Sequence, residues 1–320
     1  MIKYTIKKIL GMIPMLLIIT FIIYWLLDMT PGDPISYLMD PEALARLSEE
    51  QIAALRMQYG LDAPFIVRYF KWLGRILQGD FGYSSSSGVP VIKIMAERLP
   101  ATLELAVAAL LISTVLGSFL GVLGAIKKGS ISDNVLTVAG MIGVSIPQFF
   151  FGVCAILIFA LKLQWLPVGG RTDPSVVHFI DRIKYLILPA SVLGISMTAG
   201  VMRYARSSML DTMNKDYIKT ARSKGLPEWR VNLIHGFRVS LTPVIVLIGF
   251  RLPSLIAGSV VIETVFQWPG IGSAFNSAVR SQNYNLVMML ALLFVFMTLF
   301  ASTLVDILTA ALDPRVKLNG

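Results

Sequence analysis

The chain has 320 residues, of which 55% are hydrophobic and 15% are charged, and its formal net charge at pH 7 is +9. This is far more apolar than a soluble domain of the same length, so the composition indicates a protein that crosses a membrane several times. A positive excess of this size can accompany nucleic-acid binding, but the basic residues alternate with long apolar stretches and form no single patch. Positive charge at the ends of membrane spans is the simpler cause, and nucleic acid is not an expected partner.

Six apolar stretches are long enough to cross a bilayer, because its hydrocarbon core requires about 20 apolar residues of helix. The chain is therefore predicted to be an all-α membrane protein with six transmembrane helices. The first stretch is too long for the apolar part of a signal peptide, so it is predicted to be a retained helix. In chain order the stretches are residues 9–27, 105–126, 134–161, 185–202, 239–262 and 286–305.

The basic residues of the connecting segments indicate the orientation. With the N-terminus inside, the inner connections hold more lysine and arginine than the outer ones, and most outer basic residues lie in one long segment where the rule carries less weight. Both termini are therefore expected in the cytoplasm. The predicted parts are residues 1–27 with the first helix, an extracytoplasmic segment at residues 28–100, and a core at residues 101–320 that includes a cytoplasmic loop at residues 203–238.

The outer segment carries local structure patterns of its own. Ser48 followed by Gln51 is a capping-box pattern, which predicts a helix that continues to Tyr59. Residues 65–77 combine aromatic and basic side chains at helical spacing, which predicts an amphipathic helix at the outer membrane interface. The glycines that follow and the serine run to Ser87 predict a flexible turn.

The most charged stretch, residues 216–243, lies between two apolar segments and predicts a helix, a turn and a second helix. Gly225 is a helix stop, and Pro227 suits the first turn of a new helix. The residues expected to share one face of the first helix are Met209, Met213, Tyr217 and Ala221. Those expected to share a face of the second are Trp229, Leu233 and Phe237. Charged connections between spans are commonly only solvated loops, but these apolar stripes indicate an ordered hairpin.

This stretch resembles the so-called EAA loop of bacterial ABC importer permeases, in the D-Y-x-x-T-A-R-x-K-G form of the peptide branch. In that family the loop forms a coupling helix that docks into a groove on the cytoplasmic ATPase. The small residues that the resemblance implies for close approach are Thr220, Ala221 and Gly225. The polar contacts that it implies are Asp216, Arg222 and Lys224. Lys219 stands where the general family pattern has glutamate, and a basic residue there is typical of the peptide branch.

Further motifs extend the resemblance over essentially the whole chain. They are P-G-D-P at residues 31–34, G-D-F-G-x-S at 79–84, E-R-L-P-A-T-L at 97–103, E-T-V-F-x-W-P-G-I-G at 263–272 and D-P-R at 313–315. Each is weak alone, but in this joint order they resemble the B-type permease of dipeptide, oligopeptide or nickel importers. In that branch the outer segment covers the translocation path and meets an extracytoplasmic substrate-binding protein. The resemblance implies a location in the bacterial or archaeal cytoplasmic membrane.

No motif for catalysis or nucleotide binding occurs in the sequence. The patterns G-x-x-x-x-G-K-[ST], H-E-x-x-H and G-x-S-x-G are absent, and the single cysteine and two histidines form no cluster. The chain is therefore predicted not to be an enzyme, with no catalytic residue, no metal site and no bound cofactor. ATP is expected to be used by two cytoplasmic partner subunits, and a second similar permease is expected to complete the pore.

Two charged residues in or near the fifth span are candidates for the translocation path. Arg251 lies deep in an apolar run, where a charge is costly and usually faces a cavity or a partner. It is predicted either to face the path and attract a substrate carboxylate, or to pair with an acid or extend to the interface. Glu263 is expected to anchor the outer end of the same helix, with a place near an outer gate as the alternative.

The predicted function is translocation of dipeptides or oligopeptides by alternating access in a binding-protein-dependent ABC importer. One alternative is a permease for nickel chelates or another small solute. Another is a secondary transporter, which would be expected to carry acidic residues within its spans for ion coupling. Here the acidic residues Glu263 and Asp306 lie only at the edges of the predicted spans.

Overall fold

The computed structural model describes residues 2–29, 35, 45–59, 61–172 and 179–312. Within these residues the chain is mostly helical and has no strand, apart from an isolated antiparallel bridge between Tyr83 and Pro90. The prediction of an all-α protein is confirmed for this part of the chain. The motifs at residues 31–34 and 313–315 lie outside it.

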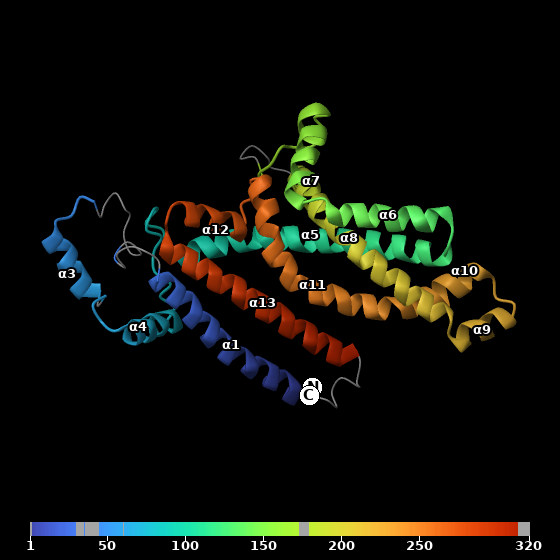
Figure 1. Ribbon diagram of the computed structural model, residues 1–320, viewed down its shortest axis with the longest axis horizontal. Coiled ribbons are helices and arrows are strands. Elements are labelled where there is room, and N and C mark those ends of the chain that lie inside the picture. The colour runs from blue at the N-terminus through green and yellow to red at the C-terminus, as the bar shows by residue number, and fades with distance from the viewer. Residues whose placement is uncertain (1, 30–34, 36–44, 60, 173–178, 313–320) are drawn as a thin grey trace.

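Long helices run between two groups of shorter ones (Figure 1). The longer helices are α1 (Ile2–Asp28), α5 (Val91–Ile126), α6 (Ile131–Ser145), α8 (Phe179–Met213), α11 (Arg238–Val265) and α13 (Tyr284–Leu312). The group at one end of the molecule is α3 (Glu49–Tyr59) and α4 (Phe65–Leu77). The group at the opposite end is α9 (Asp216–Ser223), α10 (Glu228–Arg230) and the π-helical η3 (Val231–Phe237). The remaining elements are α7 (Gln148–Ala155), the π-helical η2 (Ile156–Lys162) and α12 (Ile271–Arg280).

Four of the described helices are long and apolar enough to cross a membrane, namely Tyr4–Asp28, Val91–Ile126, Asp181–Met213 and Tyr284–Ile307. A fifth span results if α6 and the α7–η2 pair count as one, although the chain bends by 99° between them. Pro147 is the N-cap of α7, and the residue before it, Ile146, is extended with ψ 123°, as proline favours for its predecessor. The single helix predicted over residues 134–161 is therefore two helices, with the expected proline kink at the break.

Two predicted boundaries fall inside helices. α5 begins at Val91 and continues through Pro100, so the end of the predicted outer segment belongs to the first helix of the core. α8 continues past Met202 to Met213, so the predicted cytoplasmic loop begins as helix. Hydropathy marks only the apolar part of a helix, because the ends that leave the membrane carry polar residues.

The helices of the outer segment form where the sequence predicted them. The Ser48 amide donates to Gln51 Oε1 over 2.9 Å and the Gln51 amide donates to Ser48 Oγ over 3.3 Å, which is the expected capping box. α4 has the predicted bounds and packs on α1, where Tyr69 and Thr20 share a hydrogen bond of 2.9 Å. α4 is thereby fixed to the end of the first helix.

The helices α5 and α8 pack closely together in the interior of the fold (Figure 1). A Cβ atom on Gly121 of α5 would overlap the backbone and side chain of α8 at Met202 and Ala205, so glycine permits the close approach. Near the C-terminal ends of both helices, Arg206 of α8 donates two hydrogen bonds of 2.7 Å to Asp133. Asp133 lies in the first turn of α6 and is buried, so the ion pair joins α6 to α8.

Candidate functional site

The charged hairpin, defined here as α9, α10 and η3, has the predicted order of helix, turn and helix. Its turn is centred on Gly225, whose φ of +74° is a conformation that favours glycine. The Gly225 amide donates to the Arg222 carbonyl over 2.9 Å, and the Leu226 amide donates to the Ala221 carbonyl over 3.3 Å. This pair of bonds is the Schellman motif, which satisfies the last carbonyls of α9 and reverses the chain.

A small apolar core holds the two arms of the hairpin together. The residues buried in it or packed against it are Ile218, Ala221, Val231, Met213 and Leu226. Tyr217, which was predicted to share a face with Ala221, is instead 44% exposed, and the neighbouring Ile218 is buried beside Ala221. The helix is interrupted at residues 214–215, so the four-residue repeat that begins in α8 does not continue into α9.

Most of the residues expected to contact an ATPase lie on the exposed surface of the hairpin. These exposed residues are Asp216, Thr220, Arg222, Lys224 and Gly225. Ala221 is different, because it is 7% exposed and its small side chain packs within the hairpin itself. Its position predicts a role in holding the arms together and not in direct contact with a partner.

Two exposed ion pairs lie on the polar surface of the hairpin. Asp216 accepts from Lys219 over 2.9 Å within α9, and Arg222 forms a fork with Glu228 across the turn, with distances of 2.9 and 3.3 Å. Exposed pairs of this kind contribute about 0–1 kcal/mol each. They can therefore be exchanged for contacts with a partner protein at little cost.

Apolar side chains lie on the hairpin surface beside these charges. Trp229, Leu233 and Ile234 are 57%, 52% and 51% exposed. The sequence predicted that Trp229, Leu233 and Phe237 would share a face, but Trp229 and Leu233 lie on the exposed surface whereas Phe237 packs against the buried cluster that contains Met209. Exposed aromatic and aliphatic residues beside charges are typical of protein interfaces, and the sequence pattern alone did not separate them from core residues.

The hairpin is attached to both long helices that enter it. Gly236 of η3 lies against Met209 of α8, and a Cβ atom there would come within 2.8 Å of the Met209 Cε. The Ser208 hydroxyl of α8 donates to the Ser240 carbonyl of α11 over 2.9 Å. A force on the hairpin would therefore act on α8 and α11 together.

Glu263 is fully buried at the C-terminal end of α11. Its carboxylate accepts hydrogen bonds from the Thr102 hydroxyl over 2.7 Å, the Ser259 hydroxyl over 3.1 Å and the Ser273 amide over 3.0 Å. The donors belong to α5, α11 and the first turn of α12. The backbone amides of a first helical turn have no partner within the helix, so they favour a carboxylate. The geometry fits the predicted anchoring role.

The residues around Glu263 complete this junction. The Trp268 Nε1 donates to the Ala101 carbonyl of α5, and the Ile271 amide donates to the Thr102 hydroxyl, both over 2.8 Å. A Cβ atom at Gly270 would overlap the Glu263 carboxylate, so only glycine leaves room for it. The stretch at residues 263–272 therefore fixes the entry into α12 against α5.

Arg251 lies on α11 and packs against α8. Its Nη1 donates to the Met197 carbonyl over 3.4 Å, and its guanidinium occupies the space beside Gly200. Arg203 lies close enough on α8 to repel it electrostatically. Two guanidinium groups together can attract a carboxylate.

In the described residues, no group of three or more His, Cys, Asp or Glu side chains forms a potential metal site.

The chain matches known families over nearly its whole length. Residues 113–318 match the model of the binding-protein-dependent transport system inner membrane component, and residues 1–106 match the N-terminal model of such membrane components. The chain belongs to this family. The predicted resemblance to ABC permeases is thereby confirmed.

Full-length relatives support the assignment. The oligopeptide transport system permease protein AppB of Bacillus subtilis (strain 168) is 40% identical over 319 residues, which are 99% of this chain and 100% of the relative. The glutathione transport system permease protein GsiC of Salmonella choleraesuis is 34% identical, with 99% of each chain covered. The dipeptide transport system permease protein DppB of Escherichia coli (strain K12) is 33% identical, also with 99% of each covered.

A solved structure shares the fold. The inward-facing MetNI methionine ABC transporter matches with a TM-score of 0.55 at 16% identity, over 70% of this chain and 98% of that chain. At this identity the likeness concerns the arrangement of the helices and not the substrate. The family assignment and the fold therefore agree on a helical inner membrane component.

Proposed function

We propose that this chain is the transmembrane permease subunit of an ATP-driven importer that carries dipeptides or oligopeptides across the cytoplasmic membrane. Relatives named as oligopeptide, glutathione and dipeptide permeases support the substrate class. The mechanism rests on the ordered hairpin that connects α8 to α11. The sequence itself has no nucleotide-binding motif. The energy for transport then comes from separate ATPase subunits.

The proposed topology has six spans with both termini in the cytoplasm. It consists of the four long apolar helices, the bent pair of α6 and α7–η2, and α11. With 28 residues, α11 is about 42 Å long at 1.5 Å per residue, which exceeds the hydrocarbon thickness of a bilayer. α3 and α4 then lie on the outer side, where they would meet a substrate-binding protein.

The hairpin is proposed to dock into an ATPase subunit. Thr220 and Lys224 offer an exposed polar surface and Trp229 an exposed apolar anchor, while the Arg222–Glu228 pair braces the turn. When ATP closes two ATPase subunits, their movement would push on the hairpin and tilt α8 and α11. A second, similar permease would supply the other half of the path, and hydrolysis would reset it.

Arg251 and Arg203 are proposed to attract the C-terminal carboxylate of a peptide in the path. Their adjacent positive charges on α11 and α8 support this role. A nickel chelate or another small solute is the second candidate, because the importer branch that the sequence motifs resemble includes such systems. Transport driven by an ion gradient is the candidate from another class.

Reconstitution of the complete complex into liposomes tests the proposal. Uptake of labelled peptides should require both ATP and the substrate-binding protein. Arg251→Gln should lower the uptake of peptides with a free C-terminal carboxylate more than that of the same peptides with an amidated C-terminus. Nickel uptake without peptide uptake, or peptide uptake that proceeds without ATP, would contradict the proposal.

A further inference from the structure

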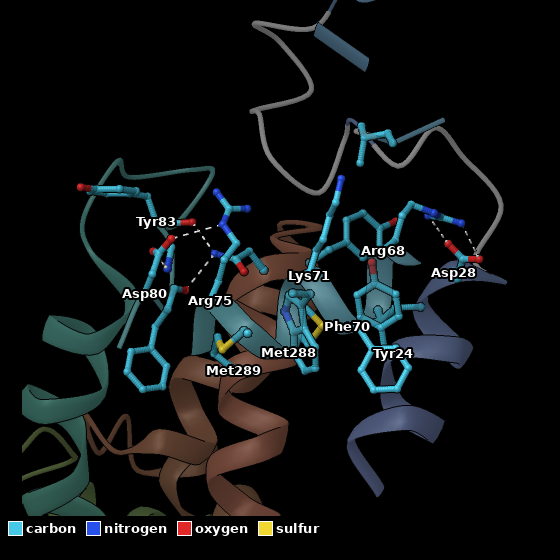
Figure 2. A pocket seen from close by; sticks show the side chains of 18 of the residues that line it. Tyr24, Asp28, Arg68, Phe70, Lys71, Arg75, Asp80, Tyr83, Met288 and Met289 are labelled. Atoms are coloured by element: carbon cyan, nitrogen blue, oxygen red, sulfur yellow. Dashed lines mark hydrogen bonds and ion pairs between the residues drawn. The ribbon is translucent and has the colours of Figure 1, made fainter. Parts of the chain in front are cut away.

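A cavity of about 860 Å³ lies at the end of the molecule opposite the hairpin (Figure 2). Its walls come from the C-terminal end of α1, from α3 and Leu61, from α4 and the turn that follows it, and from the N-terminal end of α13. It shares no residue with the hairpin or with the hydrogen bonds of Glu263. Neither the proposed coupling nor the Glu263 junction accounts for it.

The cavity has an apolar wall and a polar wall in which basic residues outnumber acidic ones. Leu27, Met288 and Met289 supply apolar wall, and both methionines are buried in the protein. Figure 2 shows the Lys71 side chain extending from α4 away from these methionines. An occupant must therefore have an apolar part and a part that tolerates positive charge.

The charges of the lining do not balance. Arg68 donates hydrogen bonds of 2.6 and 3.0 Å to Asp28, and Arg75 lies 3.4 Å from Asp80. Lys71 is exposed and has no ion pair among the described residues. One positive charge is left over in the lining, so an anionic group is favoured there.

An unused hydrogen-bond donor lies in the same wall. The Nε1–H of Trp72 is buried and has no acceptor among the described residues, although Trp72 lines the cavity. A buried donor without an acceptor is unfavourable, and an oxygen of a bound molecule would satisfy it. Trp72 follows Lys71 directly in α4, so the two residues lie within one turn of the helix.

The surface of α4 places the cavity at the depth of lipid headgroups. Ile66, Phe70 and Leu77 are 51%, 62% and 80% exposed, while basic residues occupy other positions of the same helix. An amphipathic helix of this composition lies in the membrane interface. A free inorganic anion would leave the apolar wall of the cavity uncovered, whereas a phospholipid would cover it.

We propose that this cavity binds one anionic phospholipid of the outer leaflet, with its phosphate near Lys71 and Trp72 and an acyl chain along Leu27 and Met288. The inference rests on the proposed topology, in which the C-terminal end of α1 reaches the outer membrane face. The lipid holds α4 against α1 and α13, and so fixes the outer segment relative to the bilayer.

Native mass spectrometry of the complete complex, loaded with phosphatidylglycerol or phosphatidylcholine, tests this proposal. Wild type should retain phosphatidylglycerol in preference to phosphatidylcholine. Lys71→Gln should lower the retained phosphatidylglycerol about fivefold, the effect of one basic residue near a charged lipid surface. Lys93→Gln is the matched control, because Lys93 is exposed in the first turn of α5 and does not line the cavity.

A second variant fills the cavity without removing charge. Gly74 lines it, and no atom lies within 4 Å of a Cβ placed there, so Gly74→Phe should fold and displace the lipid. Equal retention in wild type, Lys71→Gln and Gly74→Phe would overturn the proposal, as would displacement of the lipid by peptide or by inorganic phosphate. ATP-driven peptide uptake is measured on the same preparations. A wild-type complex that takes up peptide but retains both lipids equally refutes this inference alone, and a wild-type complex that retains phosphatidylglycerol without ATP-driven uptake refutes the proposed transport alone.

Discussion

Glu263 links three helices through a single side chain. A buried carboxylate is costly unless hydrogen bonds replace its water, and here two hydroxyls and one amide do so. The amide belongs to the first turn of α12, so the charge also meets the positive end of that helix. The position of α12 against α5 therefore depends on this carboxylate.

Replacement of Glu263 should destabilise the protein in proportion to the acceptors lost. Glu263→Ala leaves three donors without their acceptor and opens a cavity, which we expect to cost about 2–4 kcal/mol. Glu263→Gln keeps the size and one acceptor oxygen, and should cost clearly less. Thermal unfolding of the purified complex, followed with each variant, measures the difference. Equal melting temperatures for wild type and Glu263→Ala would show that the junction does not hold α12.

A second prediction at the scale of single residues concerns the contribution of the Asp133–Arg206 ion pair to stability. The Asp133 side chain is 4% exposed and that of Arg206 is 32% exposed, so the pair is partly shielded from water. Asp133→Asn or Arg206→Gln should each cost about 1–3 kcal/mol, because each leaves a partner with unmet hydrogen bonds. The double variant should cost less than the sum of the two single variants. Strict additivity in a double-mutant cycle would refute the coupling of α6 to α8 through this pair.

At the scale of elements, the turn of the charged hairpin depends on backbone conformation. Gly225 has φ +74°, yet a Cβ atom there would meet nothing within 4 Å. A side chain at position 225 would therefore destabilise the turn through its backbone conformation, and not through clashes with neighbouring residues. Gly225→Val should destabilise the hairpin by about 1–2 kcal/mol, whereas Gly225→Asn should have a smaller effect because asparagine tolerates this region.

Hydrogen exchange at the amides of α9 and η3 reports the stability of the hairpin directly. Faster exchange in Gly225→Val than in Gly225→Asn, with α5 unchanged as an internal reference, is the expected order. If both variants exchange like wild type, the turn does not hold the two arms. Hydrogen exchange also distinguishes a variant whose hairpin is misfolded from one whose hairpin is folded but unable to dock.

Local patterns in the sequence predicted some elements well and others only in part. The α4 bounds, the Ser48–Gln51 capping box and the glycine stop at Gly225 follow from neighbouring residues, so the sequence predicts them directly. The inner position of Ile218 depends on a helix interruption that periodicity does not mark. Pro147 marks the position of the break, but a proline in the sequence does not specify the 99° size of the bend.

The serine run of the outer segment shows the same limit. It was predicted to be a flexible turn from composition, but Ser84 is 1% exposed and accepts a hydrogen bond of 2.6 Å from Asn283. Asn285 also donates to the Tyr83 carbonyl over 2.8 Å. These contacts join positions about 200 residues apart, which no local pattern can reveal.

At the scale of the whole molecule, the two surfaces proposed to be functional lie at opposite ends of the long helices (Figure 1). The hairpin is at one end, and α4 with the cavity is at the other. Helices α8 and α11 begin or end at the hairpin, and α11 reaches the Glu263 junction with α5 and α12. A movement of the hairpin therefore has a continuous route through packed helices to the Glu263 junction.

The central claim is that the hairpin docks onto a separate ATPase subunit. It is tested most directly by cysteine cross-linking in the assembled complex, with Cys154→Ser as the background because Cys154 is the only native cysteine. Thr220→Cys introduces a thiol on the exposed face of α9, and Lys93→Cys is an exposed control at the other end of the molecule. We predict a cross-link to the ATPase subunit from position 220 and none from position 93. An intact complex in which position 220 never links to the ATPase would contradict the account.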